Sequence, residues 1–332
     1  MVSPEASRAC ALILLSVMLA LSCAIAPSAS AQDWPIRPVR LVVGQTPGAP
    51  VDLIARIVAE QLTELWQQPV VVENRGGAGS TIAAEHVAKA PADGYTLLLG
   101  GQSNLAAVAS LETPRNYDPV VDFFPVGRIV HVPYFIVVNA AVPARTIPEF
   151  IAEARARPGR ITFVSFGEGT FSSIAYRQLM SAAQIDLLEI PYKGASQAMT
   201  DLVAGRVDTS LAPLSLVKQH AATGSLRVIA ALGAKRASVA PQIATVAEQG
   251  VAGVVVETWY GLAAPAGVSA DVRAQLVEAL SRIRRSPVMR KKLEDLEYEP
   301  MFDDPAQFAA AIRADIETFT RAMKRAQPPA GR

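Results

Sequence analysis

Two stretches of the chain share one pattern and decide the fold. Residues 39–52 read VRLVVGQTPGAPVD, and residues 161–174 read ITFVSFGEGTFSSI. Each opens with a short apolar run typical of a strand, continues through a loop of small residues, and runs into the start of a helix. The recurrence predicts two equivalent strand–loop–helix units, one near the start of the chain and one in its middle.

Strands and helices alternate along the rest of the chain. Further strands are expected at residues 70–73 and 95–99, and a helix with apolar residues near 3.6 spacing is expected from Pro50. Thr146 and Glu149 form a capping box that opens another helix. The last helix is expected to start at residues 304–307, with a core-facing stripe of apolar residues at Phe308, Ile312, Ile316, Phe319 and Met323. This alternation predicts an α/β fold with parallel sheets covered on both faces.

Two apolar runs divide the chain into domains. They are VHVPYFIVVN at residues 130–139 and VVVETWYGLAA at residues 254–264, and both are typical of strands that cross between lobes. We expect a discontinuous first domain of residues 32–131 and 255–332, and an inserted second domain of residues 132–254. A two-lobed hinge architecture follows, with the cleft between the lobes as the expected binding site.

Composition and charge exclude several classes of protein. The chain has 332 residues, with 31 Lys or Arg against 30 Asp or Glu, so its net charge is +1 with neutral histidine. No global field attracts nucleic acid or an anionic membrane. Hydrophobic residues make up 51% and charged residues 18%, which excludes intrinsic disorder. We expect a monomer that does not bind nucleic acid.

The first 31 residues are typical of an export signal. Arg8 precedes an apolar run at residues 9–25, and Ala29 and Ala31 form an A-x-A cleavage site with Gln32 as the first mature residue. The prediction is a periplasmic protein with a cleaved signal peptide. A membrane anchor and lipoprotein processing at Cys23 are the alternatives.

Both cysteines, Cys10 and Cys23, lie in the segment predicted to be removed. The mature chain then has no disulfide, no thiolate ligand and no cysteine nucleophile. The three histidines, His86, His131 and His220, lack the spacing of a metal site. We therefore expect no cofactor, no metal and no catalytic residue.

The two small-residue loops are suited to holding an anion. Glycine lets the backbone approach a ligand closely, and the first N–H groups of a helix have no partner within the helix. These groups point outward at the positive end of the helix dipole. A carboxylate can therefore bind there without Arg or Lys, and neither loop contains one.

An ordered set of short motifs then resembles a known family. They include VENR at residues 72–75, APADGYTLL at 90–98, PYKG at 191–194, GRVD at 205–208 and WYGL at 259–262. Together they resemble the Bug, or TctC-like, family of substrate-binding receptors of tripartite tricarboxylate transporters. The resemblance implies a type II-like, Venus-flytrap periplasmic binding fold that captures a di- or tricarboxylate, amino acid or aromatic acid. It implies as partner a membrane permease or a sensor.

The resemblance also implies which residues bind the ligand, mainly through backbone groups of the two loops. Ala49 replaces the second glycine of the family's PGGxxD loop, and Ser173 stands where many members have histidine. Asp52 is expected either to interact favourably with the positive end of the helix dipole or to accept a hydrogen bond from the ligand. The expected ligand-binding residues are Thr46, Gly48, Ala49, Val51, Asp52, Ser103, Gly169, Thr170, Phe171, Ser172, Ser173 and Tyr192.

An enzyme is the alternative from another class. Gly167 and Gly169 follow a predicted strand and open a helix, and Glu189 follows about 20 residues later, as in a dinucleotide fingerprint. The third glycine position is Ser172, so the motif is degenerate. This alternative is an exported dinucleotide-binding oxidoreductase.

Overall fold

The computed structural model describes residues 34–110, 116–167, 170–256 and 258–326, with side chains as far as residue 321. The predicted signal peptide of residues 1–31 and the predicted cleavage site at Gln32 lie outside the described residues. Within the described ranges, no helix is long and apolar enough to cross a membrane.

Six strands of the described chain form a first sheet. Their order is β11-β4-β10-β3-β1-β2, and β1 pairs in parallel with both β2 and β3. The strands are β1 (Val39–Val43), β2 (Val70–Asn74), β3 (Thr96–Gly101), β4 (Phe123–His131), β10 (Trp259–Pro265) and β11 (Glu299–Pro300).

A second sheet has the order β7-β6-β8-β5-β9, with β6 parallel to both β7 and β8. Its strands are β5 (Phe135–Asn139), β6 (Thr162–Ser165), β7 (Leu188–Pro191), β8 (Thr209–Ala212) and β9 (Leu226–Ala231). The two predicted strand–loop–helix units are confirmed, because β1 leads into α2 (Pro50–Trp66) and β6 leads into α6 (Phe171–Ala183).

The prediction of parallel sheets was only partly right, since both sheets are mixed. β10 runs antiparallel to β3 and β4, and β5 runs antiparallel to β8 and β9. The short edge strand β11 also runs antiparallel, to β4. β5 and β10 are the two strands that follow a crossing. Each is entered from the other sheet rather than through a covering helix, so a right-handed βαβ connection does not fix its direction.

Two of the remaining helices, α5 and α11, begin where local sequence signals place them. Thr146 Oγ1 accepts a hydrogen bond from the Glu149 N–H at 3.3 Å, as the capping box predicts. Asp304 and Gln307 cap α11 reciprocally, at 2.8 and 3.0 Å. The helices are α3 (Thr81–Ala88), α4 (Gln102–Leu105), α5 (Ile147–Ala156), α7 (Ala195–Val203), α8 (Leu214–Ala222), α9 (Ala270–Arg285), α10 (Pro287–Asp295) and α11 (Pro305–Ala326), with short 3₁₀ turns at Ala78–Ser80 and Ala107–Ser110.

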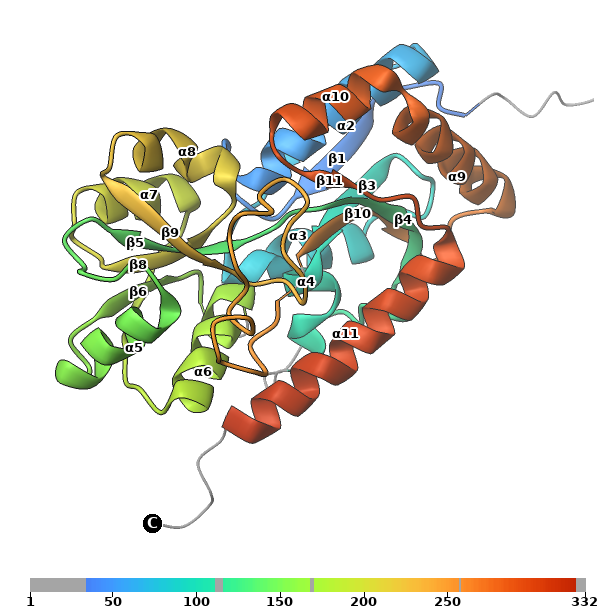
Figure 1. Cartoon of the computed structure of the whole chain (residues 1–332). Helices are drawn as coiled ribbons and strands as arrows, with labels where there is room; N and C mark the ends of the chain where they lie inside the picture. The colour runs from blue at the N-terminus through green and yellow to red at the C-terminus, as the bar shows by residue number, and fades with distance from the viewer. Residues whose placement is uncertain (1–33, 111–115, 168–169, 257, 327–332) are drawn as a thin grey trace, which may run out of the picture. The chain divides into compact units, whose positions relative to one another are not determined.

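The chain passes between the two sheets in short hydrogen-bonded segments. Figure 1 shows β4 and β5 as one nearly continuous run that leaves one sheet and enters the other. The Val132 N–H donates to the Thr258 carbonyl at 2.7 Å, so the outgoing and returning segments are paired. The Leu232 N–H donates to the Tyr134 carbonyl at 3.0 Å and ties in a third segment.

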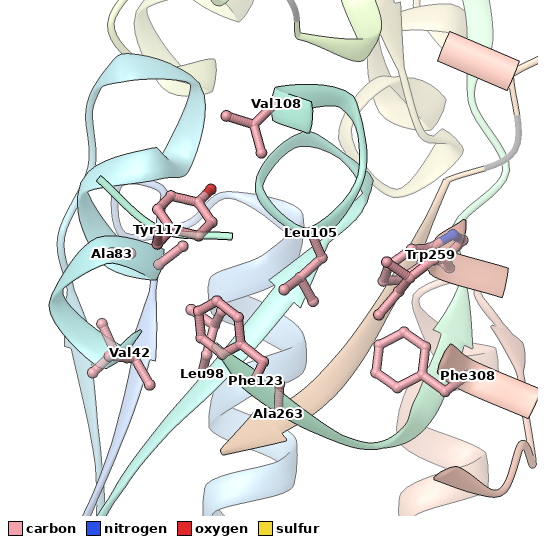
Figure 2. Close-up of a cluster of buried hydrophobic side chains, with 13 residues drawn as sticks. Val42, Ala83, Leu98, Leu105, Val108, Tyr117, Phe123, Trp259, Ala263 and Phe308 are labelled. Atoms are coloured by element: carbon pink, nitrogen blue, oxygen red, sulfur yellow. The ribbon is translucent and has the colours of Figure 1, made fainter. Parts of the chain in front are cut away.

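The predicted stripe of α11 faces the core of the first sheet. Phe308 and Ile312 are buried there, and Phe308 meets the edge of Trp259 with ring centroids 5.1 Å apart (Figure 2). Farther along α11, Phe319 packs with Ile174 of α6, so this helix also joins the two halves of the fold. The Met323 side chain lies outside the described residues.

Candidate functional site

The carboxyl ends of three parallel strands from each sheet surround one cavity of about 470 Å³. The loops after β1, β2 and β3 line it from the first sheet, and the ends of β6, β7 and β8 line it from the second. Ligands of open α/β sheets bind outside the carboxyl ends of the strands. The topology therefore makes this cavity the candidate binding site.

Five helices begin at this cavity, namely α2, α3, α6, α7 and α8. Within the described chain, none of their N-cap side chains accepts a hydrogen bond from a backbone N–H of the helix; these residues are Ala49, Ser80, Thr170, Gly194 and Pro213. Away from the cavity, Thr146, Ser269 and Ser286 do cap α5, α9 and α10 in this way. The uncapped helix starts give the cavity a positive potential from backbone dipoles.

The loop after β1 contributes Thr46 and the helix start at Pro50 to the lining. Of the other predicted residues in this loop, Gly48, Ala49 and Asp52 are not part of the lining, and Val51 lines a small adjoining pocket.

Asp52 is buried and holds the shape of this loop. Its carboxylate accepts hydrogen bonds from the Gly48 N–H at 2.9 Å, from Arg56 at 2.9 and 3.1 Å, and from Asn74 Nδ2 at 2.9 Å. Burial raises the pKa of Asp52, but the hydrogen bonds from Arg56, Gly48 and Asn74 outweigh it and leave that pKa below its ordinary value. With these four bonds made, Asp52 positions the loop, and its side chain does not reach the cavity.

The loop after β6 contributes Thr170 and Phe171. The Thr170 hydroxyl donates to the Gly167 carbonyl at 2.7 Å and does not cap the N–H groups at the start of α6. Ser172 and Ser173 are buried off the lining: Ser172 Oγ accepts from the Phe166 N–H at 3.3 Å, and Ser173 Oγ accepts from Arg177. The predicted residue Gly169 lies outside the described residues.

The remaining two predicted residues both line the cavity. Ser103 lies at the start of α4, directly after β3, and Tyr192 lies directly after β7. The structure therefore brings together Thr46, Ser103, Thr170, Phe171 and Tyr192 from four distant parts of the chain.

The sequence analysis missed a third loop, Gly76–Ser80, which follows β2 and leads into α3. Its backbone is left-handed at Gly79 and Ser80, with φ of 63° and 75°. It packs so tightly against the first loop that a Cβ on Gly44 would lie 2.3 Å from Ser80 Cβ. The GGAGS run after an apolar strand carried the same signal as the other two loops.

Sequence analysis also missed a pair of hydrogen-bonded tyrosines at the cavity, Tyr134 and Tyr260. Tyr134 lies in the outgoing crossing segment, and its hydroxyl shares a hydrogen bond with Tyr260 of β10, which also bonds to Gln45. Burial raises the pKa of Tyr260 to about 12 and raises that of Tyr134 well above its ordinary value, so both phenols stay neutral. The Tyr134 ring meets the edge of Phe171 at 4.6 Å between centroids.

Comparison with known proteins agrees with this geometry. The family described as "Tripartite tricarboxylate transporter family receptor" matches residues 54–326. Protein BugT of Bordetella pertussis is 32% identical over 303 residues, which cover 90% of this chain and 92% of BugT. Rpa4515 of R. palustris, solved with adipate, has a TM-score of 0.84 at 31% identity and covers 89% of this chain and 98% of its own. The periplasmic binding protein BugD has a TM-score of 0.82 at 31% identity, with 88% and 98% covered.

Two α/β lobes, two crossing segments and a cavity between the sheets define a Venus-flytrap solute-binding protein of the periplasmic binding class. The chain belongs to the tripartite tricarboxylate transporter receptor family, the Bug proteins, as its motifs indicated. It is a substrate-binding receptor and not an enzyme, so the oxidoreductase alternative is set aside.

Proposed function

We propose that this receptor captures a small carboxylate in the 470 Å³ cavity and holds its anionic group with backbone N–H groups at the helix starts. The observation that carries the proposal is the convergence of five helix N-termini without side-chain caps on one cavity. Such termini attract a carboxylate through both their free N–H groups and the helix dipole. The adipate bound to the related Rpa4515 supports the same ligand class.

The proposed contacts divide into two roles. Thr46, Ser103, Thr170, Phe171 and Tyr192 meet the ligand or present the backbone that does so. Gly48, Ala49, Val51, Asp52, Ser172 and Ser173 support the two loops, since their contacts lie within the protein. Gly169 belongs with the second loop.

We further propose that residues 32–131 with 255–332 form one lobe and residues 132–254 the other, and that the lobes close around the ligand. The crossing near Val132 and Thr258 would be the hinge. Export with cleavage before Gln32 would place the receptor in the periplasm as a monomer, where it delivers its ligand to a membrane permease or a sensor. The family's role as transporter receptors supports the permease.

A thermal-shift panel of dicarboxylates, citrate, amino acids, and aliphatic and aromatic monocarboxylic acids tests the proposal. A ligand at 100 times its Kd stabilises the native state by about 2.7 kcal/mol, which gives a clear rise in melting temperature. Neutral amides of the same acids are the control and should give no rise. The proposal fails if no acid in the panel stabilises the protein, or if acids and amides do so equally.

A further inference from the structure

The cavity has an unusual distribution of charge. Among its described lining residues, Lys193 is the one charged side chain, and it is exposed to solvent. None of these lining residues is Asp or Glu. The nearby carboxylate of Asp52 is buried and already accepts four hydrogen bonds. An ammonium group on a ligand would therefore find no counter-ion at the lining, and it would face the positive ends of five helices.

Several apolar side chains line the cavity on the second sheet's side and form its apolar wall. Phe166, Met199 and Leu216 line the cavity and pack against the buried core that includes Ala198 and Val217. These three side chains are only partly buried, so part of each faces the cavity. A ligand body placed here exchanges water for hydrocarbon contacts, whereas a hydroxyl or amine on that body loses its hydration without a new partner.

The hydroxyl groups beside this wall are engaged within the protein. The Tyr192 hydroxyl donates to Asp201 Oδ2 at 3.0 Å, and the other oxygen of Asp201 accepts from Arg206 at 2.8 Å. The Ser210 hydroxyl donates to the Leu211 carbonyl at 3.3 Å. These groups therefore do not offer free donors to a hydroxylated ligand.

From these observations we infer that the receptor is specific for carboxylates with an unsubstituted hydrocarbon body, aliphatic or aromatic, and rejects amino and hydroxy acids. The inference rests on the proposed function and narrows its ligand class. The helix starts recognise the carboxylate, and the wall of Phe166, Met199 and Leu216 selects the body. A cavity of about 470 Å³ has room for an aromatic ring as well as the carboxylate.

Matched pairs of ligands test the inference by isothermal titration calorimetry of the purified protein. The pairs are 3-phenylpropanoate against phenylalanine, glutarate against glutamate, and succinate against malate, each differing by one amine or hydroxyl. In every pair that binds, we expect the unsubstituted acid to bind at least 30-fold more tightly, because the unpaired polar group is desolvated. Equal or tighter binding of the substituted acids overturns the inference and leaves the proposed function intact. If none of the three unsubstituted acids binds, the inference fails, and the thermal-shift panel decides separately whether the proposed function stands.

Substitution of Met199 tests the wall itself. Met199→Asn should weaken binding of the tightest hydrocarbon acid about tenfold. Met199→Leu, which keeps an apolar side chain of similar volume, should weaken it no more than about twofold. Thermal melting of both variants checks that each is folded, and a similar loss for both would count against selection by this wall. Met199→Asn should also narrow the preference for 3-phenylpropanoate over phenylalanine. An unchanged ratio contradicts the assignment of this side chain.

Discussion

Thr170→Asp tests whether the start of α6 holds the ligand's carboxylate. Thr170 has the extended backbone of an ordinary N-cap residue, with φ of −76° and ψ of 156°, but its side chain does not cap the helix. An aspartate there would accept hydrogen bonds from the first-turn N–H groups that we assign to the ligand. The protein's own carboxylate would then occupy the ligand's place.

The effects on stability and on binding should have different magnitudes. A good N-cap stabilises a helix by about 1 kcal/mol, and losing the hydrogen bond from Thr170 to Gly167 costs about 1 kcal/mol, so stability should change little. Two carboxylates about 4 Å apart repel by roughly 4 kcal/mol at an effective dielectric constant near 20. That repulsion corresponds to about a thousandfold loss of affinity.

Titration calorimetry with the tightest acid from the panel measures this loss. Thr170→Asn is the matched variant, because it has the shape and capping ability of aspartate without its charge, and it should lose far less affinity. Ser269→Asp places the same charge at the capped start of α9, where affinity should not change. Binding by a folded Thr170→Asp variant within tenfold of the parent would refute the role of this helix start.

Three further predictions follow from the site. Lys193→Met should weaken binding no more than about fivefold, because an exposed cation contributes little to affinity. Lys291→Met on α10 is the matched control. A hundredfold loss of affinity in Lys193→Met would mean that a side chain holds the anion. Gly194→Val should weaken binding about tenfold, since a Cβ there lies 3.0 Å from Thr46 Oγ1 and would hold the loops apart. Small-angle scattering should show that the ligand-saturated Gly194→Val variant is less compact than the ligand-saturated parent. Adding Thr46→Ala to Gly194→Val should restore part of the affinity, and no restoration would contradict a contact between the two loops. Asp52→Asn should lower the free energy of unfolding by about 1–3 kcal/mol at pH 7. Because the native pKa lies below the ordinary value of 3.8, the unfolded carboxyl protonates before the native one as the pH falls below about 4, so this difference should shrink over that range. Denaturant titrations with equal differences at pH 7 and pH 3 would contradict it.

The parts of the fold that depend on neighbouring residues could be predicted from the sequence. The capping boxes at Thr146 and Asp304 place two helix starts correctly. Thr46 and Thr170 line the cavity as expected, because each follows a strand whose carboxyl end must lie at the same edge as its neighbours. These features depend on short stretches of chain whose signals are local.

The features that depend on distant contacts could not be predicted in the same way. Asp52 belongs to the loop rather than the cavity because Asn74, 22 residues away, donates to it. The apolar residues of β5 and β10 do not predict the direction of these strands, because parallel and antiparallel strands that are buried on both faces have similar sequences. The small residues of the GGAGS run indicated the third loop, but the left-handed backbone of Ser80, which packs against the first loop, could not be predicted from its residue type.

A crystal structure of the receptor with its tightest acid tests the central claim most directly, because the claim concerns where the carboxylate lies. We predict that the carboxylate oxygens lie about 3 Å from backbone nitrogens at the helix starts beside Thr170 and Ser80, with the ligand body against Met199 and Leu216. A carboxylate paired with Lys193 Nζ instead, or bound outside this cavity, would contradict the account.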